Sequence, residues 1–280
     1  MPLGTGQWRG LGLVPNIFPI ESFMDEAAHA AGIDPLQFRL DHLPSDADGR
    51  RMAAVLGAAA ERAGWGTTPP SGRSRGIACG SLHGTVVAEI AEISLDESTG
   101  RIRLHRVVAA IDCGRVINPK QVRSQVEGGV VMGASSALME ELTVKDGRVV
   151  AGGLDEYLLF TMADTPDIET IILNRPDLKP SGCGEPPIGP IAPAIGNAFC
   201  ALTGVRLRQL PMTPERVLAA LTASPRVDEP TSRWPSKEVD GRAQTARGAV
   251  GEPYRTTDKE AGMRTIALEE PFTLGEGPLG

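Results

Sequence analysis

A single carboxylate stands out in residues 181–198, which read SGCGEPPIGPIAPAIGNA and carry one charged side chain, Glu185. The glycines, prolines and small apolar residues around it predict a rigid, partly buried turn that leads into a helix. A general base must be fixed near the proton that it removes, and such a frame would fix one. From the residues alone two interpretations stay open for Glu185: a catalytic base, or a side chain that caps the following helix or faces solvent.

The cysteines and histidines are too dispersed to predict a metal site. None of the four cysteines belongs to a CxxC pair, which argues against structural zinc and against an iron–sulfur cluster bound by this chain alone. We therefore expect reduced cysteines that fill the core of a cytoplasmic protein. The four cysteines are Cys79, Cys113, Cys183 and Cys200, and the four equally dispersed histidines are His29, His42, His83 and His105.

The composition is that of a globular chain of 280 residues with a net charge of −7. No basic stripe with interleaved aromatic residues is present, which argues against nucleic-acid binding. No apolar run approaches the roughly 18 to 20 residues that span a bilayer. The first residues also lack the basic and apolar regions of a signal peptide.

The elements that must position Glu185 begin with a helix at residues 16–32, where apolar side chains recur at helical spacing and Gly32 is a natural stop. Asp25 and Glu26 are expected on the solvated side of this helix, where a structural role is favoured. Its expected apolar face consists of Ile20, Phe23, Met24, Ala27, Ala28 and Ala31.

The rest of the pattern predicts an α+β fold, with helices and an antiparallel or mixed sheet. The period changes from helical to strand-like at Gly76, and the runs 76–96 and 101–114 predict an antiparallel hairpin around the turn at 97–100. The other expected elements are helices at 34–43, 51–63, 119–138, from Pro190 or Pro193 to Thr203 and at 213–221, and strands at 142–150 and 168–173.

Residues 223–280 differ from the rest of the chain in composition. They show no periodicity and are rich in proline, glycine, serine, threonine and charge. Such a segment cannot bury enough apolar surface to fold alone, so we expect a disordered tail. Residues 1–222 are expected to form one domain.

Three stretches carry unusual motifs. They are QWRGLG with NIFPIESFMDEAA, then AAIDCGRVINPKQVRSQVEGGVVMGASSALMEEL, then PSGCGEPPIGPIAPAIGNAFCALTGVRLRQLP. In this order, over about residues 3–221, they resemble the C-terminal part of the molybdopterin-binding large subunit of the xanthine dehydrogenase (molybdenum hydroxylase) family. The resemblance is nearest to the bacterial isoquinoline 1-oxidoreductase and nicotinate dehydrogenase type. It implies that residues 1–222 are the C-terminal portion of such a domain, truncated at its N-terminus.

The resemblance implies a molybdenum–pterin cofactor, in bacteria usually the molybdopterin cytosine dinucleotide form. The activity implied is hydroxylation of an N-heterocycle or oxidation of an aldehyde, with water as the oxygen source. Electrons would leave through 2Fe-2S clusters on a small partner subunit, and the N-terminal half of the molybdenum subunit would be a second partner. A different hypothesis stays open: a catalytically inert fragment, or a scaffold for a partner chain.

Residue by residue, the resemblance assigns roles to positions that match the family motifs. Glu185 of the Gly184-Glu185 pair would be the catalytic base, and Gly184 would contribute to cofactor binding. Gln125 would hydrogen-bond the pterin, because a neutral amide both donates and accepts. Gly128 and Gly129 would let the backbone approach the cofactor, with helix packing as the alternative.

The N-terminal motif supplies two further candidates. Arg9 would bind the cofactor region or orient its loop through the planar fork of its guanidinium group, and Trp8 would form a wall of the substrate pocket. The alternative for both is ordinary exposure near a frayed terminus. Molybdenum would be held through the pterin, without a protein ligand. Asp112, Gly114 and Asn118 are expected to be turn residues that satisfy local backbone donors.

Overall fold

The computed structural model describes residues 6–153 and 155–223, so the expected disordered tail at 223–280 lies almost entirely outside the described residues. The α+β class is confirmed. The described elements are, in chain order, α1 (Leu13–Ala31), α2 (Pro35–Asp41), α3 (Ala47–Ala63), β1 (Arg73–Leu82), β2 (Thr85–Asp96), β3 (Arg101–Asp112), α4 (Pro119–Leu138), β4 (Val144–Lys145), β5 (Arg148–Val149), β6 (Asp167–Ile172), the 3-10 helix η1 (Pro186–Ile188), α5 (Ile191–Thr203) and α6 (Pro214–Ala223).

The centre of the fold is a four-stranded sheet in the order β1-β2-β3-β6. β1, β2 and β3 pair antiparallel, and β6 lies parallel to β3 at the edge. The expected hairpin is confirmed as β2 and β3. The strand-like run 76–96 is interrupted at His83 and Gly84, which both have positive φ angles. This two-residue turn divides the run into β1 and β2.

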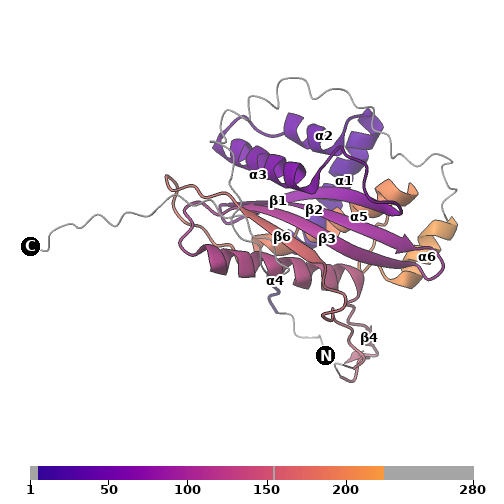
Figure 1. Ribbon diagram of the computed structural model, residues 1–280. Coiled ribbons are helices and arrows are strands. Elements are labelled where there is room, and N and C mark those ends of the chain that lie inside the picture. The colour runs from indigo at the N-terminus through magenta and orange to yellow at the C-terminus, as the bar shows by residue number, and fades with distance from the viewer. Residues whose placement is uncertain (1–5, 154, 224–280) are drawn as a thin grey trace, which may run out of the picture.

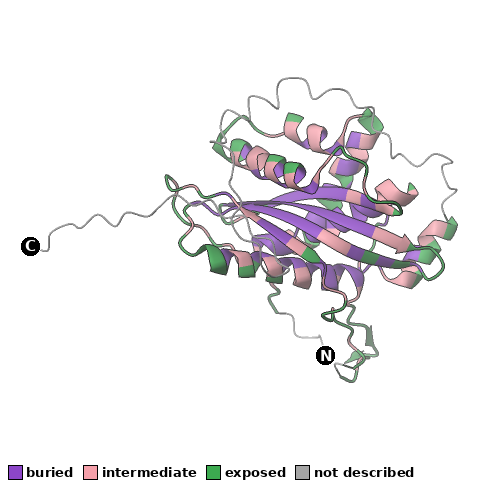
Figure 2. Cartoon of the chain, viewed as in Figure 1, coloured by how far each residue is buried: buried purple, intermediate pink, exposed green. Residues whose placement is uncertain are grey.

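Helices cover both faces of the sheet, with α3 on one side and α4 on the other in Figure 1. On the α3 side, its apolar residues join those of β1, β2 and β3 in one cluster. On the other side, α4 and α5 pack against the sheet in a second cluster. Most of β2 and the second half of β3 are buried, whereas β6 and the start of β3 are more exposed (Figure 2). Gly76 allows α5 to approach closely, because a Cβ there would lie 2.2 Å from the Ala198 nitrogen.

Local signals in the sequence set several helix ends correctly. The Asp34 carboxylate accepts hydrogen bonds from two backbone amides at the start of α2, as the N-cap prediction requires. Gly32, Gly64 and Gly204 end α1, α3 and α5 in the left-handed conformation. α3 starts earlier than expected, at Ala47, because the side chain preceding it caps the helix. All four cysteines are free, two of them buried and two half-buried.

The buried face of α1 is not the face that the apolar spacing predicts. Ile20 and Phe23, expected in the core, are 54% and 68% exposed. Asp25, expected on the solvated side, is buried. The buried residues are Ile17, Phe18, Glu21, Ser22, Asp25 and Ala28. The prediction was therefore wrong for Ile20, Phe23 and Asp25, although Ala28 is buried as expected. The burial of Asp25 depends on charges supplied by other segments.

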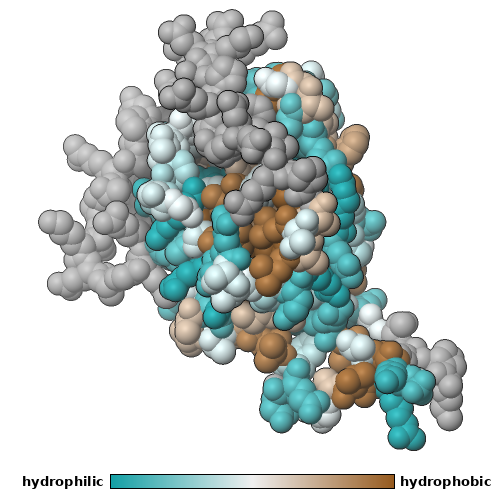
Figure 3. All heavy atoms as spheres, turned by 90° about the vertical axis from the view of Figure 1, so that its right-hand side faces the viewer, coloured by the Kyte–Doolittle hydropathy of each residue, from teal (hydrophilic) through white to brown (hydrophobic). Residues whose placement is uncertain are grey.

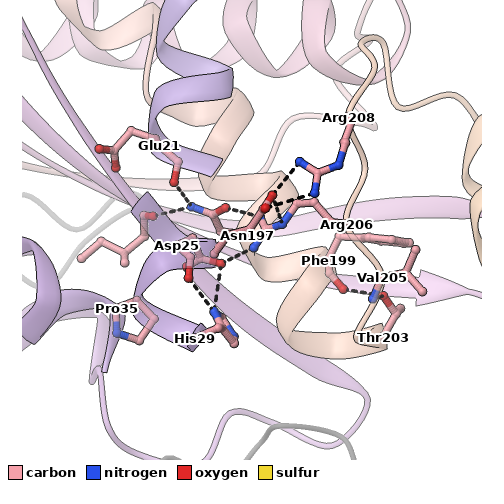
Figure 4. Close-up of polar contacts among 12 residues, drawn as sticks. Glu21, Asp25, His29, Pro35, Asn197, Phe199, Thr203, Val205, Arg206 and Arg208 are labelled. Atoms are coloured by element: carbon pink, nitrogen blue, oxygen red, sulfur yellow. Dashed lines mark hydrogen bonds and ion pairs between the residues drawn. The ribbon is translucent and has the colours of Figure 1, made fainter. Parts of the chain in front are cut away.

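Arginines from other segments neutralise the buried carboxylates of α1, and Figure 4 shows Arg206 beside Asp25 and Asn197. Arg206 donates to Asp25 Oδ2 at 2.5 Å and to Asn197 Oδ1 at 2.6 Å. Asn197 donates in turn to the backbone carbonyl of Glu21 at 3.3 Å. The Glu21 carboxylate accepts from Arg39 Nε at 2.8 Å. We call these five residues the α1 polar cluster, and their mutual pairing makes the burial of their charges tolerable.

Within the part of the chain that the structure describes, no helix is both long enough and apolar enough to cross a membrane.

Candidate functional site

The loop that precedes η1 places Glu185 beside the turn between β1 and β2. The Glu185 carbonyl accepts a hydrogen bond from the Ile188 amide at 3.1 Å, but the Glu185 side chain makes no capping bond. The capping interpretation is therefore wrong. The carboxylate is 36% exposed, and its Oε2 lies 3.8 Å from His83 Nε2. Glu185 thus combines a fixed backbone with a carboxylate that a reactant can reach.

Arg9 joins this loop to the middle of α4. Its Nε donates to the Gly184 carbonyl at 2.5 Å, and its Nη2 donates to the Gln125 carbonyl at 2.9 Å and to Gln125 Oε1 at 3.3 Å. Burial lowers the pKa of Arg9, against the opposing effect of Glu185 and Cys183. Arg9 is therefore an anchored residue, and the frayed-terminus interpretation is wrong for it.

We call Arg9, Gln125, Gly184 and Glu185 the Glu185 cluster. Its members come from three segments that are far apart in the sequence: the residues before α1, the centre of α4 and the loop before η1. The structure thus brings together one residue or more from each of the three family-like motifs. A carboxylate, a carboxamide and a guanidinium group meet there at a surface that is partly open.

The glycines of the site have different surroundings. A Cβ at Gly129 would lie 2.8 Å from Pro187 Cβ, so the lack of a side chain lets η1 pack on α4. Gly128 is exposed, and a Cβ there would be in ordinary contact, 3.6 Å from Arg9 Nη1. A Cβ at Gly184 would lie 3.2 Å from Gln125 Oε1. Gly129 therefore serves packing, whereas Gly128 borders the open side of the cluster.

Trp8 lines a groove that no member of the Glu185 cluster borders. This groove is apolar, has a volume of about 1050 Å³ and lies between α1 and residues 207–210. The surface in Figure 3 shows hydrophobic residues gathered in the centre of a mostly hydrophilic face. The main lining residues of the groove are Trp8, Leu11, Phe18, Phe23, Leu207 and Leu210.

Asp112 has the structural role expected of it. It accepts from Arg51 Nη2 at 2.8 Å, from the Gly114 amide at 2.9 Å and from Arg175 Nε at 3.2 Å. Burial alone would raise the pKa of Asp112, but these hydrogen bonds and the Arg51 charge outweigh burial and lower it. Asn118 likewise caps α4 by accepting from the Gln121 amide at 3.2 Å.

Two residues at the site were not singled out in the sequence: His83, in the turn between β1 and β2, and Thr85, the first residue of β2. Thr85 is fully buried, and its hydroxyl lies 2.7 Å from Ser181 Oγ and 2.8 Å from the Gly182 carbonyl. His83 faces Glu185. The available signal was the His-Gly pair, which is typical of a tight turn because Gly84 adopts positive φ readily.

The donors and acceptors of the Glu185 cluster suit a polar, planar heterocycle such as a pterin. Gln125 is exposed, and among the described residues its amide nitrogen has no hydrogen-bond partner, so this group is free to bind a ligand. Gly128 leaves the adjacent helix surface open. Among these same residues, no group of three or more histidine, cysteine or acidic side chains is placed to hold a metal ion.

Comparison with known proteins shows which family the chain resembles. Residues 58–166 match the family model of the molybdopterin cofactor-binding domain. A nicotinate dehydrogenase subunit of Pseudomonas putida is 36% identical over 238 residues, which is 79% of this chain and 20% of that protein. The beta subunit of isoquinoline 1-oxidoreductase from Brevundimonas diminuta is 34% identical over 209 residues, 74% of this chain and 26% of that protein.

A solved structure supports the fold. The aldehyde oxidoreductase from Desulfovibrio gigas matches with a TM-score of 0.64 at 18% identity, over 77% of this chain and 42% of that chain. At this identity the likeness concerns the fold alone. The chain spans about a fifth to a quarter of the length of the two curated relatives above.

Proposed function

Because the chain belongs to the molybdopterin-binding subunits of the molybdenum hydroxylase family, we propose that it forms the C-terminal part of a cofactor-binding domain in such an enzyme. In this proposal the domain comprises residues 1–222. The observation that carries the proposal is the contact of Arg9 with both Gly184 and Gln125, which joins the three family motifs at one place.

The residues of the Glu185 cluster would hold the cofactor by hydrogen bonds. The free amide of Gln125 would bind an edge of the pterin, and Arg9 would fix both Gln125 and the Gly184 carbonyl beside it. Gly128 would leave room for close approach. Gly129 would contribute through its contact with Pro187, which sets the position of the turn after Glu185.

When bound, the cofactor supplies the two-electron oxidation. Glu185 would act as the general base: its carboxylate accepts a proton in each turnover and releases it to solvent afterwards. Two hydrogen bonds fix its backbone, one at the Gly184 carbonyl and one at its own carbonyl. A base held in this way contributes roughly 10²- to 10⁴-fold to the rate.

The proposed substrate is an N-heterocycle or an aldehyde, with water as the source of the inserted oxygen. The names of the relatives support these classes, since they include a nicotinate dehydrogenase, an isoquinoline oxidoreductase and an aldehyde oxidoreductase of Escherichia coli. Trp8 would form part of a substrate wall once the remainder of the subunit is in place. The proposed cofactor is the cytosine dinucleotide form.

The proposed partners follow from the share of the relatives that the chain covers. The chain matches 20% of the nicotinate dehydrogenase subunit, so the remaining part of a molybdenum subunit would complete the pocket. A small subunit with 2Fe-2S clusters would receive the electrons. The proposed location is the cytoplasm, or the periplasmic face for a full complex.

The test is co-expression of the chain with these two partners, followed by molybdenum analysis and turnover of heterocycles and aldehydes. We expect Glu185→Gln to retain molybdenum but to lose turnover at least about 100-fold. Glu61→Gln, on an exposed turn of α3, is the matched control and should keep full activity. Full turnover by a molybdenum-loaded Glu185→Gln complex would overturn the base assignment. Absence of molybdenum from every complex would favour the inert fragment.

A further inference from the structure

We infer that the turn between β1 and β2 and the first residue of β2 together position Glu185: Thr85 fixes the backbone of the loop that carries Glu185, and His83 orients its carboxylate. The inference rests on the proposed function, because it assigns two positioning residues to the proposed base. It also concerns contacts that exist in the chain without its cofactor. These contacts can therefore be tested separately from catalysis.

Thr85 makes a double connection to the loop. Its hydroxyl donates to the Gly182 carbonyl at 2.8 Å, so the contact of 2.7 Å with Ser181 must use the Ser181 hydroxyl as donor. Thr85 is fully buried, and a buried hydroxyl that both donates and accepts has a defined orientation. Thr85 thereby holds the first half of the loop in one place.

The loop depends on this support because of its composition. Residues 181–184 read SGCG, and two glycines in four residues leave the backbone wide freedom. A Cβ at Gly182 would have nothing within 4 Å, so packing does not restrain that residue. The loop is restrained by the Thr85 contacts, by the bond from the Ser181 amide to the Cys113 carbonyl at 2.8 Å, and by the bond from Arg9 to Gly184.

His83 lies close to the Glu185 carboxylate. Its φ of 52° is an unusual left-handed conformation for a residue other than glycine. In this conformation its Nε2 lies 3.8 Å from Glu185 Oε2, with exposed fractions of 64% for His83 and 36% for Glu185. Residues with such backbone conformations cluster at functional sites. Glu185 and Cys183 both interact electrostatically with the nearby guanidinium group of Arg9.

Together the two contacts restrict both the loop and the side chain. Thr85 limits where the Glu185 backbone lies, and His83 limits which way its carboxylate points. Small displacements of a base can reduce a rate by up to about 100-fold. The positioning residues should therefore affect kcat more than KM.

The first experiment measures hydrogen exchange in the full chain of 280 residues, without cofactor. In Thr85→Val we expect the two amides that bond at the ends of the loop, Ser181 on the Cys113 carbonyl and Ile188 on the Glu185 carbonyl, to exchange about five- to tenfold faster. The reason is that the variant loses the hydrogen bonds of the Thr85 hydroxyl, each of which contributes about 1 kcal/mol, a factor of about five. Thr85→Ser should restore the wild-type rate. Thr99→Val, in the turn between β2 and β3, is the matched control and should leave these amides unchanged.

The second experiment observes the histidine rings by NMR in the same chain. Glu185→Gln should shift the ring signals of His83 and leave those of His42, which bonds the Phe38 carbonyl on α2, in place. Unchanged His83 signals together with unchanged exchange in Thr85→Val would overturn the inference. Because His83 is largely exposed, His83→Asn should fold even if Thr85→Val does not.

The third experiment measures turnover in the loaded complex. We expect His83→Asn and Thr85→Val each to lower kcat about tenfold with KM changed less than about twofold, and Thr85→Ser to recover activity. If Glu185→Gln keeps full turnover, the proposed function fails while exchange and NMR still decide the inference. If Glu185→Gln is inactive but both positioning variants match the wild type in every measurement, the inference alone fails.

Discussion

The α1 polar cluster and the Glu185 cluster both contain a glutamate close to an arginine, yet the two glutamates have different surroundings. Glu21 is 4% exposed and accepts from Arg39 Nε at 2.8 Å and from the Cys79 amide at 3.0 Å. Glu185 is 36% exposed, and within the described part of the chain its carboxylate pairs with His83 alone, at 3.8 Å.

This difference separates a carboxylate that stabilises the fold from one that can react. The oxygens of Glu21 are occupied by donors within the protein, so another reactant would have to displace them. The backbone carbonyl of Glu185 accepts a hydrogen bond, but its carboxylate caps no helix, so the carboxylate oxygens remain able to accept a proton. Arg9 contributes to this arrangement by bonding the Gly184 carbonyl and Gln125.

The largest expected effect on stability tests whether Glu21 stabilises the fold more than Glu185 does. Glu21→Gln leaves the buried guanidinium of Arg39 without its counter-charge, which should lower the free energy of unfolding by about 3–5 kcal/mol. Glu185→Gln, at a half-exposed position, should change it by less than about 0.5 kcal/mol. Urea unfolding of the two variants measures both values. Equal losses would show that the two carboxylates do not differ in the way described.

An intermediate effect concerns the contact on which the Glu185 loop rests. Gly129→Ala places a Cβ 2.8 Å from Pro187, and this overpacking should lower the free energy of unfolding by about 1–3 kcal/mol. Gly57→Ala is the matched control within α3, where a Cβ has nothing within 4 Å. It should stabilise the protein by about 0.5–1 kcal/mol, since alanine favours a helix interior. Thermal unfolding measures both changes. If Gly129→Ala and Gly57→Ala changed the free energy of unfolding in the same direction, the packing role of Gly129 would be contradicted.

The smallest expected effect is a pH dependence at Asp112, a carboxylate fixed like Glu21 but nearer the Glu185 loop. Its pKa lies below the ordinary value of 3.8, so its stabilisation is present above that value and is lost as the pH falls through the folded-state pKa. Asp112→Asn should remove a contribution on the order of 1 kcal/mol at pH 6. Unfolding measured between pH 6 and pH 3 should therefore be flatter for the variant than for the wild type.

Local signals in the sequence were enough to predict the α+β fold class and most of the helices and strands. Asp34, Gly64 and Gly204 mark helix ends because a cap acts on amides or carbonyls within a few residues. The face of α1 could not be predicted in the same way. Its buried carboxylate Asp25 pairs with Arg206, which is 181 residues away, and the spacing within one helix contains no trace of that partner.

At the candidate site, too, residues with a local sequence signal could be predicted, whereas contacts between distant segments could not. Glu185, Gln125 and Arg9 were identified because they match motifs, and in the structure Arg9 contacts both Gln125 and the residue before Glu185. The positioning residues were not identified. The hydroxyl of Thr85 reaches a loop 97 residues further along the chain, and such a contact leaves no local pattern in either segment.

The large sequence separation of these contacts affects when they form during folding. The hydrogen bond from Arg9 to Gly184 joins residues 175 positions apart. Closing so long a loop is opposed by chain entropy, and contacts of this range generally form after the local ones that offset that entropy. A nascent chain whose last helices are still on the ribosome would have neither this bond nor the loop that Thr85 holds. Insertion of a pterin should accordingly follow, and not guide, the folding of the chain.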